Sequence, residues 1–432
     1  MIRLPYGREF IAFDESGTKV LRSRVNELTG GGAGEQIVRE AMARPYGGTS
    51  LRELAKGKKT CTLIISDHTR PVPSRDILPA MLEELRGGNP EIEITLLVAT
   101  GCHRGTTRAE LREKLGEAAA SSERIVVHDA FDESSNVCVG SLPSGAPLVI
   151  DRLAAETDLL AAEGFIEPHF FAGFSGGRKS VLPGVCDRVT VLGNHCSRFI
   201  DSPFARAGIL EQNPIHRDMA AAAVTAKLRY IVNAVIDENK RTVAAFAGEP
   251  AAAHAAGCAF LRPFCEVRGE AADIVITNNG GAPLDQNIYQ CVKGLTAAEA
   301  ASKENAILIL CAECADGVGG DGIYRLLKEC AGPGELYESI MARPQEKTTP
   351  DQWQGQILAR ILKKHRIIFV TRPELETVVR DMKMDFAPSL PAALGRARRN
   401  KGGSASVAVI PNGVSVIVGL HQSGGRGDTQ TP

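Results

Sequence analysis

Short apolar runs alternate with amphipathic, alanine- and leucine-rich segments along most of the chain. An apolar run bounded by polar or glycine positions predicts a buried strand, and a segment with helical spacing between two such runs predicts a crossover helix. This alternation is typical of parallel sheets covered by helices. The predicted strands are 60–66, 92–100, 124–128, 159–163, 229–236, 273–277, 306–311, 366–370 and 406–410, and the predicted helices are 77–86, 107–115, 251–259 and 295–302.

The strand and helix alternation divides into two cycles. The segment 263–270 is polar and contains proline, and a second cycle begins after it at 273. We therefore expect an α/β protein of two α/β domains with mainly parallel sheets, in which 1–270 form the N-terminal domain and 271–420 the C-terminal domain. The glycine-rich end of the chain, 421–432, is predicted to be a disordered tail.

Composition and charge narrow the class of protein. The 432 residues carry 50 Lys and Arg against 51 Asp and Glu, for a net charge of −1. A near-neutral balance argues against a surface built for nucleic acid or for an anionic membrane. The start of the chain does not look like a signal peptide, and there is no run of about 18 apolar residues that would span a bilayer. We expect a cytoplasmic protein whose cysteines stay reduced, and the lone Cys311-x-x-Cys314 pair does not make up a four-thiolate zinc site.

Polar clusters follow three of the predicted strands. They are 67–71 (DHTRP), 100–104 (TGCHR) and the longer 167–185 (EPHFFAGFSGGRKSVLPGV). In open α/β sheets the loops at the carboxyl ends of strands form the functional crevice. His103, His169 and His195 all lie in such glycine-rich or charged surroundings, a setting that favours general acid/base work or metal ligation.

The segment 173–180 (GFSGGRKS) is similar to a Walker A loop but fails its pattern, because Arg178 stands where GxxxxGK requires glycine. Backbone N–H groups beside Arg178 and Lys179 still suit a phosphate. A lysine in apolar surroundings also has a lowered pKa and is nucleophilic. A solvated turn is the simpler alternative. The segment 317–322 matches GxGxxG, yet its spacing from the preceding strand favours a tight turn near a domain interface over a dinucleotide site.

Taken together, these motifs resemble the nickel-dependent lactate racemase family. The matching segments are 67–71, 99–104, 168–184, 193–195 and 285–294, and they keep a consistent order over 1–420. The resemblance implies an active site in the cleft between the two domains. It also implies a nickel-pincer nucleotide, the Ni(II) complex of pyridinium-3-thioamide-5-thiocarboxylic acid mononucleotide.

The resemblance further implies a role for each matching residue. The nucleotide would be attached covalently to Lys179, with His195 as the protein ligand of nickel and His103 and His169 as the acid/base pair. The residues implied to hold the cofactor are Asp67, Thr69, Arg70, Gly176, Gly177 and Arg178. Those implied to bind substrate are Arg70, Tyr289, Gln290, Lys293 and Trp353.

The implied reaction is an isomerisation that inverts C2 of a lactate-like 2-hydroxy acid. The C2 proton is poorly acidic because the adjacent carboxylate is already negative, so hydride removal to a 2-oxo acid is the easier route, and the cofactor carries that chemistry. The family includes enzymes for lactate, malate, larger aliphatic or aromatic hydroxy acids and sugar acids. The expected partners are the small-molecule substrate and, transiently, the cofactor-making enzymes, with neither nucleic acid nor membrane, for a monomer or homodimer.

Two other enzyme classes remain open at the level of sequence. One is an ATP-dependent phosphoryl transferase that uses the 176–179 loop, and it would require magnesium and a nearby metal-binding aspartate. The other is a zinc-dependent hydrolase with His103, His169 and His195 as ligands. A carrier of nickel or nucleotide without catalytic function is a third reading, but it gives no role to two acid/base histidines.

Overall fold

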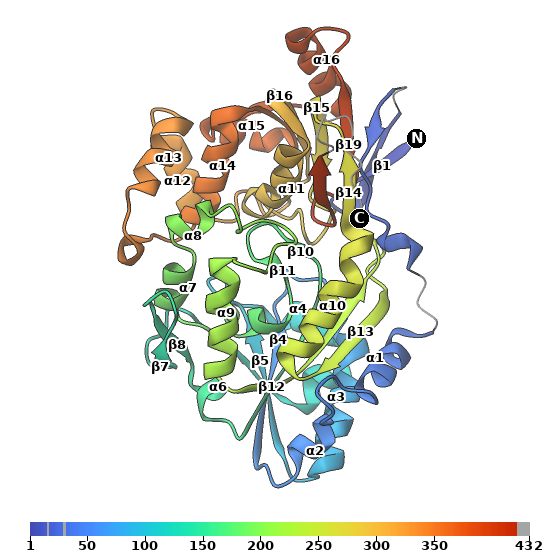
Figure 1. Cartoon of the computed structure of the whole chain (residues 1–432), viewed down its shortest axis with the longest axis vertical. Helices are drawn as coiled ribbons and strands as arrows, with labels where there is room; N and C mark the ends of the chain where they lie inside the picture. Colours follow the sequence, from blue (N-terminus) through green and yellow to red (C-terminus); the bar gives the residue numbers. More distant parts are fainter. Residues whose placement is uncertain (15–16, 29–31, 421–432) are drawn as a thin grey trace, which may run out of the picture.

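Two six-stranded sheets form the two lobes of the molecule (Figure 1). The computed structural model describes residues 1–14, 17–28 and 32–420, so the predicted tail 421–432 lies outside the described residues. Both sheets consist mainly of parallel strands, which confirms the predicted fold class.

The N-terminal lobe has the strand order β13-β12-β9-β4-β5-β6, and only β13 runs antiparallel. Its strands are β4 (Thr60–Ser66), β5 (Glu93–Ala99), β6 (Arg124–Val127), β9 (Leu159–Phe165), β12 (Leu228–Ile236) and β13 (Thr242–Gly248). The central strands are nearly continuous apolar runs because helices cover both faces of the sheet. Helices α1 (Gly34–Met42), α2 (Leu51–Ala55), α3 (Ser74–Gly88) and α4 (Arg108–Leu115) pack on one face, and α6 (Arg152–Glu156), α9 (Pro214–Thr225) and α10 (Pro250–Cys265) pack on the other.

The C-terminal lobe has the order β18-β17-β16-β15-β19-β3, and all its strands are parallel. They are β3 (Lys19–Val20), β15 (Ala272–Asn278), β16 (Ser302–Cys311), β17 (Arg366–Val370), β18 (Asp385–Ala387) and β19 (Val407–Ile410). On the face toward the N-terminal lobe lie α11 (Ile288–Ala300) and α14 (Gln352–Lys364).

The beginning of the chain belongs spatially to the C-terminal lobe. Strands β1 (Ile2–Tyr6) and β2 (Glu9–Phe13) form a hairpin whose Leu4 and Phe13 enter the core of the C-terminal sheet. The backbone N–H of Gly7, at the hairpin turn, donates to Asp285 Oδ2 over 2.7 Å. The hairpin therefore braces the loop that leads into α11.

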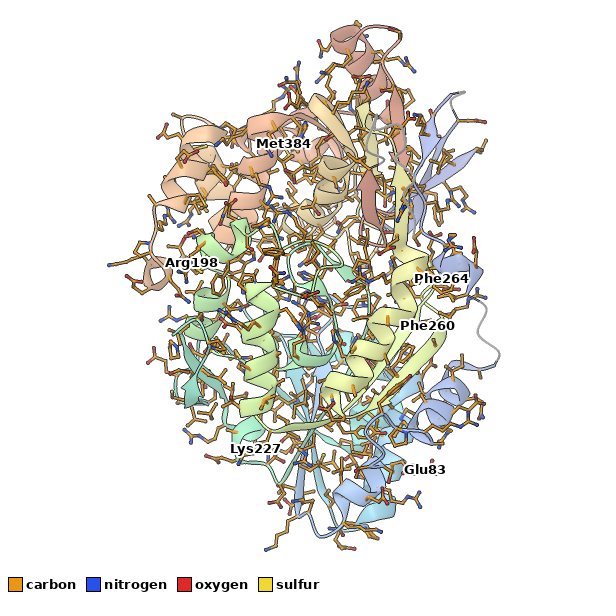
Figure 2. The ribbon with its side chains drawn as sticks, in the orientation of Figure 1. Glu83, Arg198, Lys227, Phe260, Phe264 and Met384 are labelled. Carbon is orange, nitrogen blue, oxygen red and sulfur yellow. The ribbon has the colours of Figure 1, made fainter. Side chains whose placement is uncertain are left out.

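The chain crosses between the lobes a second time near residue 265. The segment 263–270, expected as a polar connection, is the end of α10 followed by β14 (Glu266–Gly269), which pairs with β20 (Ile417–Leu420). A proline inside α10, Pro263, does not end the helix. The outer side of this helix carries Phe260 and Phe264, with ring centroids 5.8 Å apart (Figure 2). The boundary at 270 stays a prediction.

Short elements fill the space between the two sheets. They include the small ribbon β10 (Pro168–His169) and β11 (Gly173–Phe174), the 3₁₀ turn η2 (Gly177–Ser180), α7 (Arg188–Asn194) and α8 (Ser197–Asp201). Gln356 on α14 donates from Nε2 to the carbonyl of Ser197 over 2.9 Å, which ties α8 to the C-terminal lobe. None of the helices in the described ranges is long and apolar enough to cross a membrane.

The remaining helices and strands complete the two lobes. They are α5 (Glu117–Ser122), β7 (Asn136–Ser141), β8 (Pro147–Asp151), α12 (Asp321–Glu329), α13 (Pro333–Met341), α15 (Glu376–Asp381), α16 (Leu390–Lys401), η1 (Val25–Glu27), η3 (Gln345–Lys347) and η4 (Pro373–Leu375).

Candidate active site

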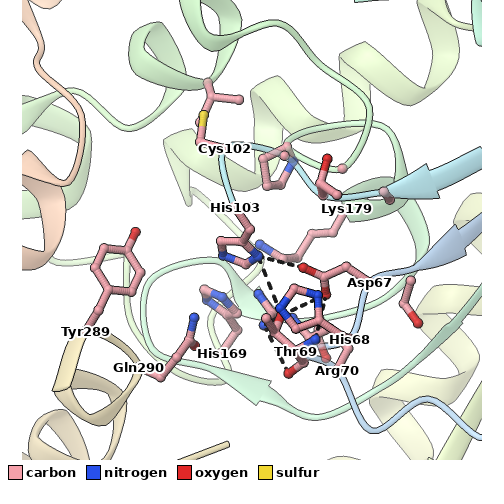
Figure 3. A pocket seen from close by; sticks show the side chains of 18 of the residues that line it. Asp67, His68, Thr69, Arg70, Cys102, His103, His169, Lys179, Tyr289 and Gln290 are labelled. Carbon is pink, nitrogen blue, oxygen red and sulfur yellow. Dashed lines mark hydrogen bonds and ion pairs between the residues drawn. The ribbon is translucent and has the colours of Figure 1, made fainter. Parts of the chain in front are cut away.

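A cavity of about 630 Å³ lies between the lobes at the carboxyl ends of β4, β5 and β9. The loops after these strands form one wall, and α11 and the residues around the start of α14 form the other (Figure 3). The motifs singled out in the sequence therefore meet in one place, although they lie far apart along the chain.

The turn after β4 is organised around Asp67, which is 2% exposed. Its Oδ1 accepts from the backbone N–H of Thr69 over 3.1 Å and from Thr69 Oγ1 over 2.7 Å. Arg70 in turn donates from a terminal nitrogen to Thr69 Oγ1 over 2.7 Å. Burial alone would raise the pKa of Asp67, but the facing His103 ring and the positive charge of Arg70 hold it well below its usual range. Asp67 is therefore a buried anion that organises this wall.

His103 and His169 both line the cavity but are held in different ways. His103 Nδ1 lies 2.7 Å from Asp67 Oδ2, so this nitrogen carries a proton and donates a hydrogen bond to the carboxylate. His169 Nδ1 instead accepts from the backbone N–H of Ala172 over 3.2 Å. The pKa of His169 is well below its ordinary value because of burial and then of the nearby cations, chiefly Lys179 and Lys293. His169 is thus a neutral ring at neutral pH.

The glycine-rich loop brings Lys179 into the cavity. Gly176 and Gly177 have positive φ values of 79° and 55°, and a Cβ on Gly177 would lie 2.8 Å from the ring of His254. Only glycine fits at these positions, because the backbone is left-handed there and the ring of His254 packs directly against Gly177. The pKa of Lys179 lies well below its usual value because of burial and, next, of Arg178, Arg70 and Lys293. Its amine is accordingly suited to act as a nucleophile.

Arg178 points away from the cavity. Its guanidinium lies beneath the loop, where it donates to the carbonyls of Ala172 and Gly176 over 2.7 and 3.2 Å and to Nδ1 of His216 over 3.0 Å. A fourth contact joins it to Nε2 of His254 over 2.8 Å. Since its donors are used inside the protein, the side chain braces the loop, and we do not carry it forward as a phosphate ligand.

His195 lies in an aromatic enclosure at the end of α7. Its ring makes edge contacts with Phe171 and Trp353, with centroids 5.1 and 4.9 Å away. The Nδ1 atom of His195 is buried and has no hydrogen-bond partner among the described residues. Burial and the charge of Lys179 lower the pKa of His195 to about 3. A neutral imidazole with an unused nitrogen is the form that binds a metal.

The wall from the C-terminal lobe is built on the first turns of α11. Asn287 caps this helix by accepting from the backbone N–H of Gln290 over 3.0 Å. Tyr289, Gln290 and Lys293 then face the cavity, and Gln290 Oε1 is buried without a partner. Burial and the charge of Arg70 lower the pKa of Lys293 to about 7, although Glu167 opposes the shift. This wall offers hydrogen-bonding and cationic groups that the protein itself leaves largely unused.

Some lining residues lie outside the implied site set. Gly319 and Gly320 belong to the glycine-rich 317–322 segment, which the sequence assigned to a turn and which lines the cavity. Asp351 and Gln354 come from the start of α14, and no motif marked them. No sequence motif indicates that an aspartate before a helix has a left-handed backbone conformation or that Gln354 faces a cavity. The tertiary structure is what places both residues in the site.

The described residues contain no group of three His, Cys, Asp or Glu side chains placed to hold a metal ion. The three histidines of the zinc hypothesis therefore do not form a ligand set by themselves. Cys311 and Cys314 do not pair with each other as a metal site either; Cys314 Sγ instead lies 3.8 Å from Cys291 Sγ.

The fold and the cavity define a two-lobed α/β enzyme whose site lies between a wall of acid/base groups and a wall of anion-binding groups. Two family models match the chain: the lactate racemase N-terminal domain over residues 6–208 and the lactate racemase C-terminal domain over residues 267–418. The chain belongs to the lactate racemase family, as the sequence motifs had indicated, and that family is one of isomerases.

Individual relatives agree over nearly the whole length. The chain is 50% identical to a lactate racemase of Thermoanaerobacterium thermosaccharolyticum and 46% identical to one of Lactiplantibacillus plantarum, in each case over 96% of this chain and 99% of the relative. The solved lactate racemase apoprotein from T. thermosaccharolyticum superposes with a TM-score of 0.91 at 50% identity, over 96% of this chain and 99% of that one. A Thermotoga maritima protein, 17% identical with a TM-score of 0.68 over 90% of this chain and 98% of that one, shares the fold.

Proposed function

We propose that this protein interconverts the two enantiomers of lactate, with a nickel-pincer nucleotide attached to Lys179 and His195 as the protein ligand of nickel. The observation that carries the proposal is the placement of Lys179, His103, His169 and His195 around one cavity in a chain of this family. Membership in the lactate racemase family supports the reaction, and it implies a nickel cofactor.

The residues present fit such a cofactor. Lys179 has no ion-pair partner among the described residues and a lowered pKa, so its amine would hold the nucleotide as a thioamide, formed with a thiocarboxyl group of the nucleotide by loss of water. His195 offers a neutral imidazole, and a cofactor that brings its own sulfur donors complements this single protein ligand. When bound, the group would supply a reversible acceptor for the C2 hydride.

The protein's own groups bind the substrate and handle its hydroxyl proton. Arg70 and Lys293 are cations from opposite walls, and together they can hold the carboxylate of a 2-hydroxy acid. The bond from His103 Nδ1 to Asp67 leaves Nε2 free to accept the hydroxyl proton, while the buried carboxylate stabilises the imidazolium that results.

His169 begins in the opposite tautomer. Because its Nδ1 accepts from Ala172, the proton of the neutral ring must sit on Nε2. At rest it can donate a hydrogen bond to the substrate oxygen. To accept a proton from the other enantiomer, it must first give up the bond from Ala172. The two histidines therefore differ in resting tautomer: His103 is ready to accept the hydroxyl proton, and His169 is ready to donate a hydrogen bond.

The test combines mass, metal and turnover. Protein co-expressed with the cofactor-making enzymes should carry an adduct on Lys179 by intact mass and peptide mapping, contain nickel by elemental mass spectrometry, and racemise either enantiomer of lactate by chiral chromatography. Loaded protein that leaves both lactate enantiomers unchanged would overturn the proposal.

The structure does not support the phosphoryl-transferase hypothesis. Its loop would require a phosphate cradle leading into a long helix, whereas the segment here is the short 3₁₀ turn η2 with Arg178 folded beneath it. We therefore do not propose a second function.

A further inference from the structure

We infer that Asp351 selects the substrate by its charge. Its carboxylate repels a second negative group, so the site accepts 2-hydroxy acids whose side chain is uncharged and rejects hydroxydicarboxylates. The inference rests on the proposed function and deepens it, because that function alone does not separate lactate from malate.

The backbone holds Asp351 in a fixed position. The residue immediately precedes α14 and has a φ of 63°, the left-handed conformation that aspartate and asparagine tolerate best among non-glycine residues. Its Oδ2 accepts from the backbone N–H of Gly322 over 3.1 Å at the start of α12. The side chain therefore does not swing freely into solvent, and its negative charge stays at one place in the cavity wall.

Asp351 lies close to Tyr289 and within electrostatic range of His103. A Cβ added to Gly320 would lie 2.8 Å from Asp351 Oδ2 and 3.1 Å from the ring of Tyr289, so the carboxylate is a close neighbour of the tyrosine. Burial raises the pKa of Asp351, while the hydrogen bond from Gly322 and the neighbouring His103 oppose that shift. Across the cleft, burial raises the pKa of Cys102 and the charge of Asp351 raises it further. Asp351 is thus within electrostatic reach of the acid/base histidine from the opposite lobe.

The rest of the cavity would attract a dianion. Arg70 and Lys293 line it as cation-forming side chains, and Asp67 is already paired with His103. With a cofactor attached to Lys179, Arg70 and Lys293 are the groups left to hold one substrate carboxylate. A second carboxylate in this cavity would meet the negative charge of Asp351, which lines the same cavity beside Tyr289. Two like charges at close range in a partly desolvated site cost enough to exclude a ligand.

The decisive variant is Asp351→Asn. Asparagine tolerates the same backbone conformation, and its amide oxygen can still accept from Gly322, so the charge is removed while the cap is kept. We expect the ratio of kcat/KM for malate to that for lactate to rise roughly 10- to 100-fold in the loaded enzyme. The matched control is Asp321→Asn, an exposed carboxylate on the rim of the same cavity, for which the ratio should change by less than about twofold.

Binding to the apoprotein gives a second readout that does not depend on the cofactor. Isothermal titration with L-malate and with L-lactate should show a selective gain in malate affinity for Asp351→Asn. An unchanged ratio in a folded, lactate-active Asp351→Asn enzyme overturns the inference and leaves the proposed function intact. A loaded wild-type enzyme that processes malate as well as lactate overturns it too, whereas a wild type inactive on lactate overturns the proposed function itself.

Discussion

The two walls of the cleft are built on different principles. On the N-terminal wall the key side chains are tied to one another: Asp67 holds His103, and the backbone of Ala172 holds His169. On the C-terminal wall Gln290 and Lys293 have few internal partners, and the side-chain oxygen of Gln290 is buried without one. One wall is arranged in advance for chemistry, and the other is arranged to receive a ligand. Variants of the first should therefore lose rate, and variants of the second should lose affinity.

The largest effect is expected for Lys179→Ala on the N-terminal wall. It removes the group proposed to form the covalent bond to the nucleotide, so covalent attachment and racemisation should both fall to background. Intact mass of co-expressed protein measures this directly. Lys293→Ala, a change of cation on the opposite wall, serves as the control and should keep the adduct. An identical adduct on Lys179→Ala would remove this residue from the proposal.

The next effect is expected for His103→Ala and His169→Ala. Loss of a general acid/base costs roughly 10² to 10⁴ in rate, so each variant should lose net racemisation by about that factor while its cofactor content stays normal. Each should still oxidise one enantiomer to bound 2-oxo acid, and the preferred enantiomer should differ between the two.

Isotopes test the same step in the wild type. Lactate deuterated at C2 should show a primary isotope effect and keep most of its label in the product. Complete exchange of the label with solvent would indicate proton abstraction at carbon, and the hydride route would have to be abandoned.

A smaller loss is expected for Asp67→Asn. The amide can still occupy the space, but it no longer stabilises a protonated His103, so we expect kcat to fall by roughly 10- to 1,000-fold with a smaller change in KM. Steady-state kinetics at several pH values measures this. A change confined to KM would place Asp67 in substrate binding instead.

The smallest effect is a pH dependence on the C-terminal wall. The pKa of Lys293 is lowered to about 7, so its ammonium form, which binds the substrate carboxylate, is lost as the pH rises above that value. The KM for lactate should therefore increase with pH, by up to about tenfold per unit. Lys293→Arg keeps its charge over this range and should flatten the increase; an equally steep profile in that variant would assign the titration to another group.

The sequence predicted most of the sheet framework but less of the cleft. The apolar run of β4 was predicted with its observed bounds, since a strand covered on both faces is uniformly apolar. The start of α11 was missed by seven residues, because its first turns carry Tyr289, Gln290 and Lys293, whose polar side chains serve the cavity and hide the helical period. The direction of Arg178 was also out of reach, since it depends on His216 and His254 from two later helices.

Asp351 shows the same limit of prediction from sequence. Its significance comes from lying beside Tyr289 and across from His103, and these neighbours are 62 and 248 positions away in the sequence. A local sequence motif does not reveal contacts between positions this far apart; the folded structure does. Asp67 and Thr69, by contrast, bond to each other within one short segment, and the motif in that segment marked both.

The N-terminal hairpin has a practical consequence for dissecting the molecule. Leu4 and Phe13 fill the core of the far lobe, and Gly7 anchors the loop before α11. A cut near residue 270 would leave the downstream fragment with an uncovered sheet edge at β19 and a hole in its interior, while the upstream fragment would carry a stray apolar hairpin. Separate expression of the substrate-binding half thus requires grafting the first 21 residues back onto it.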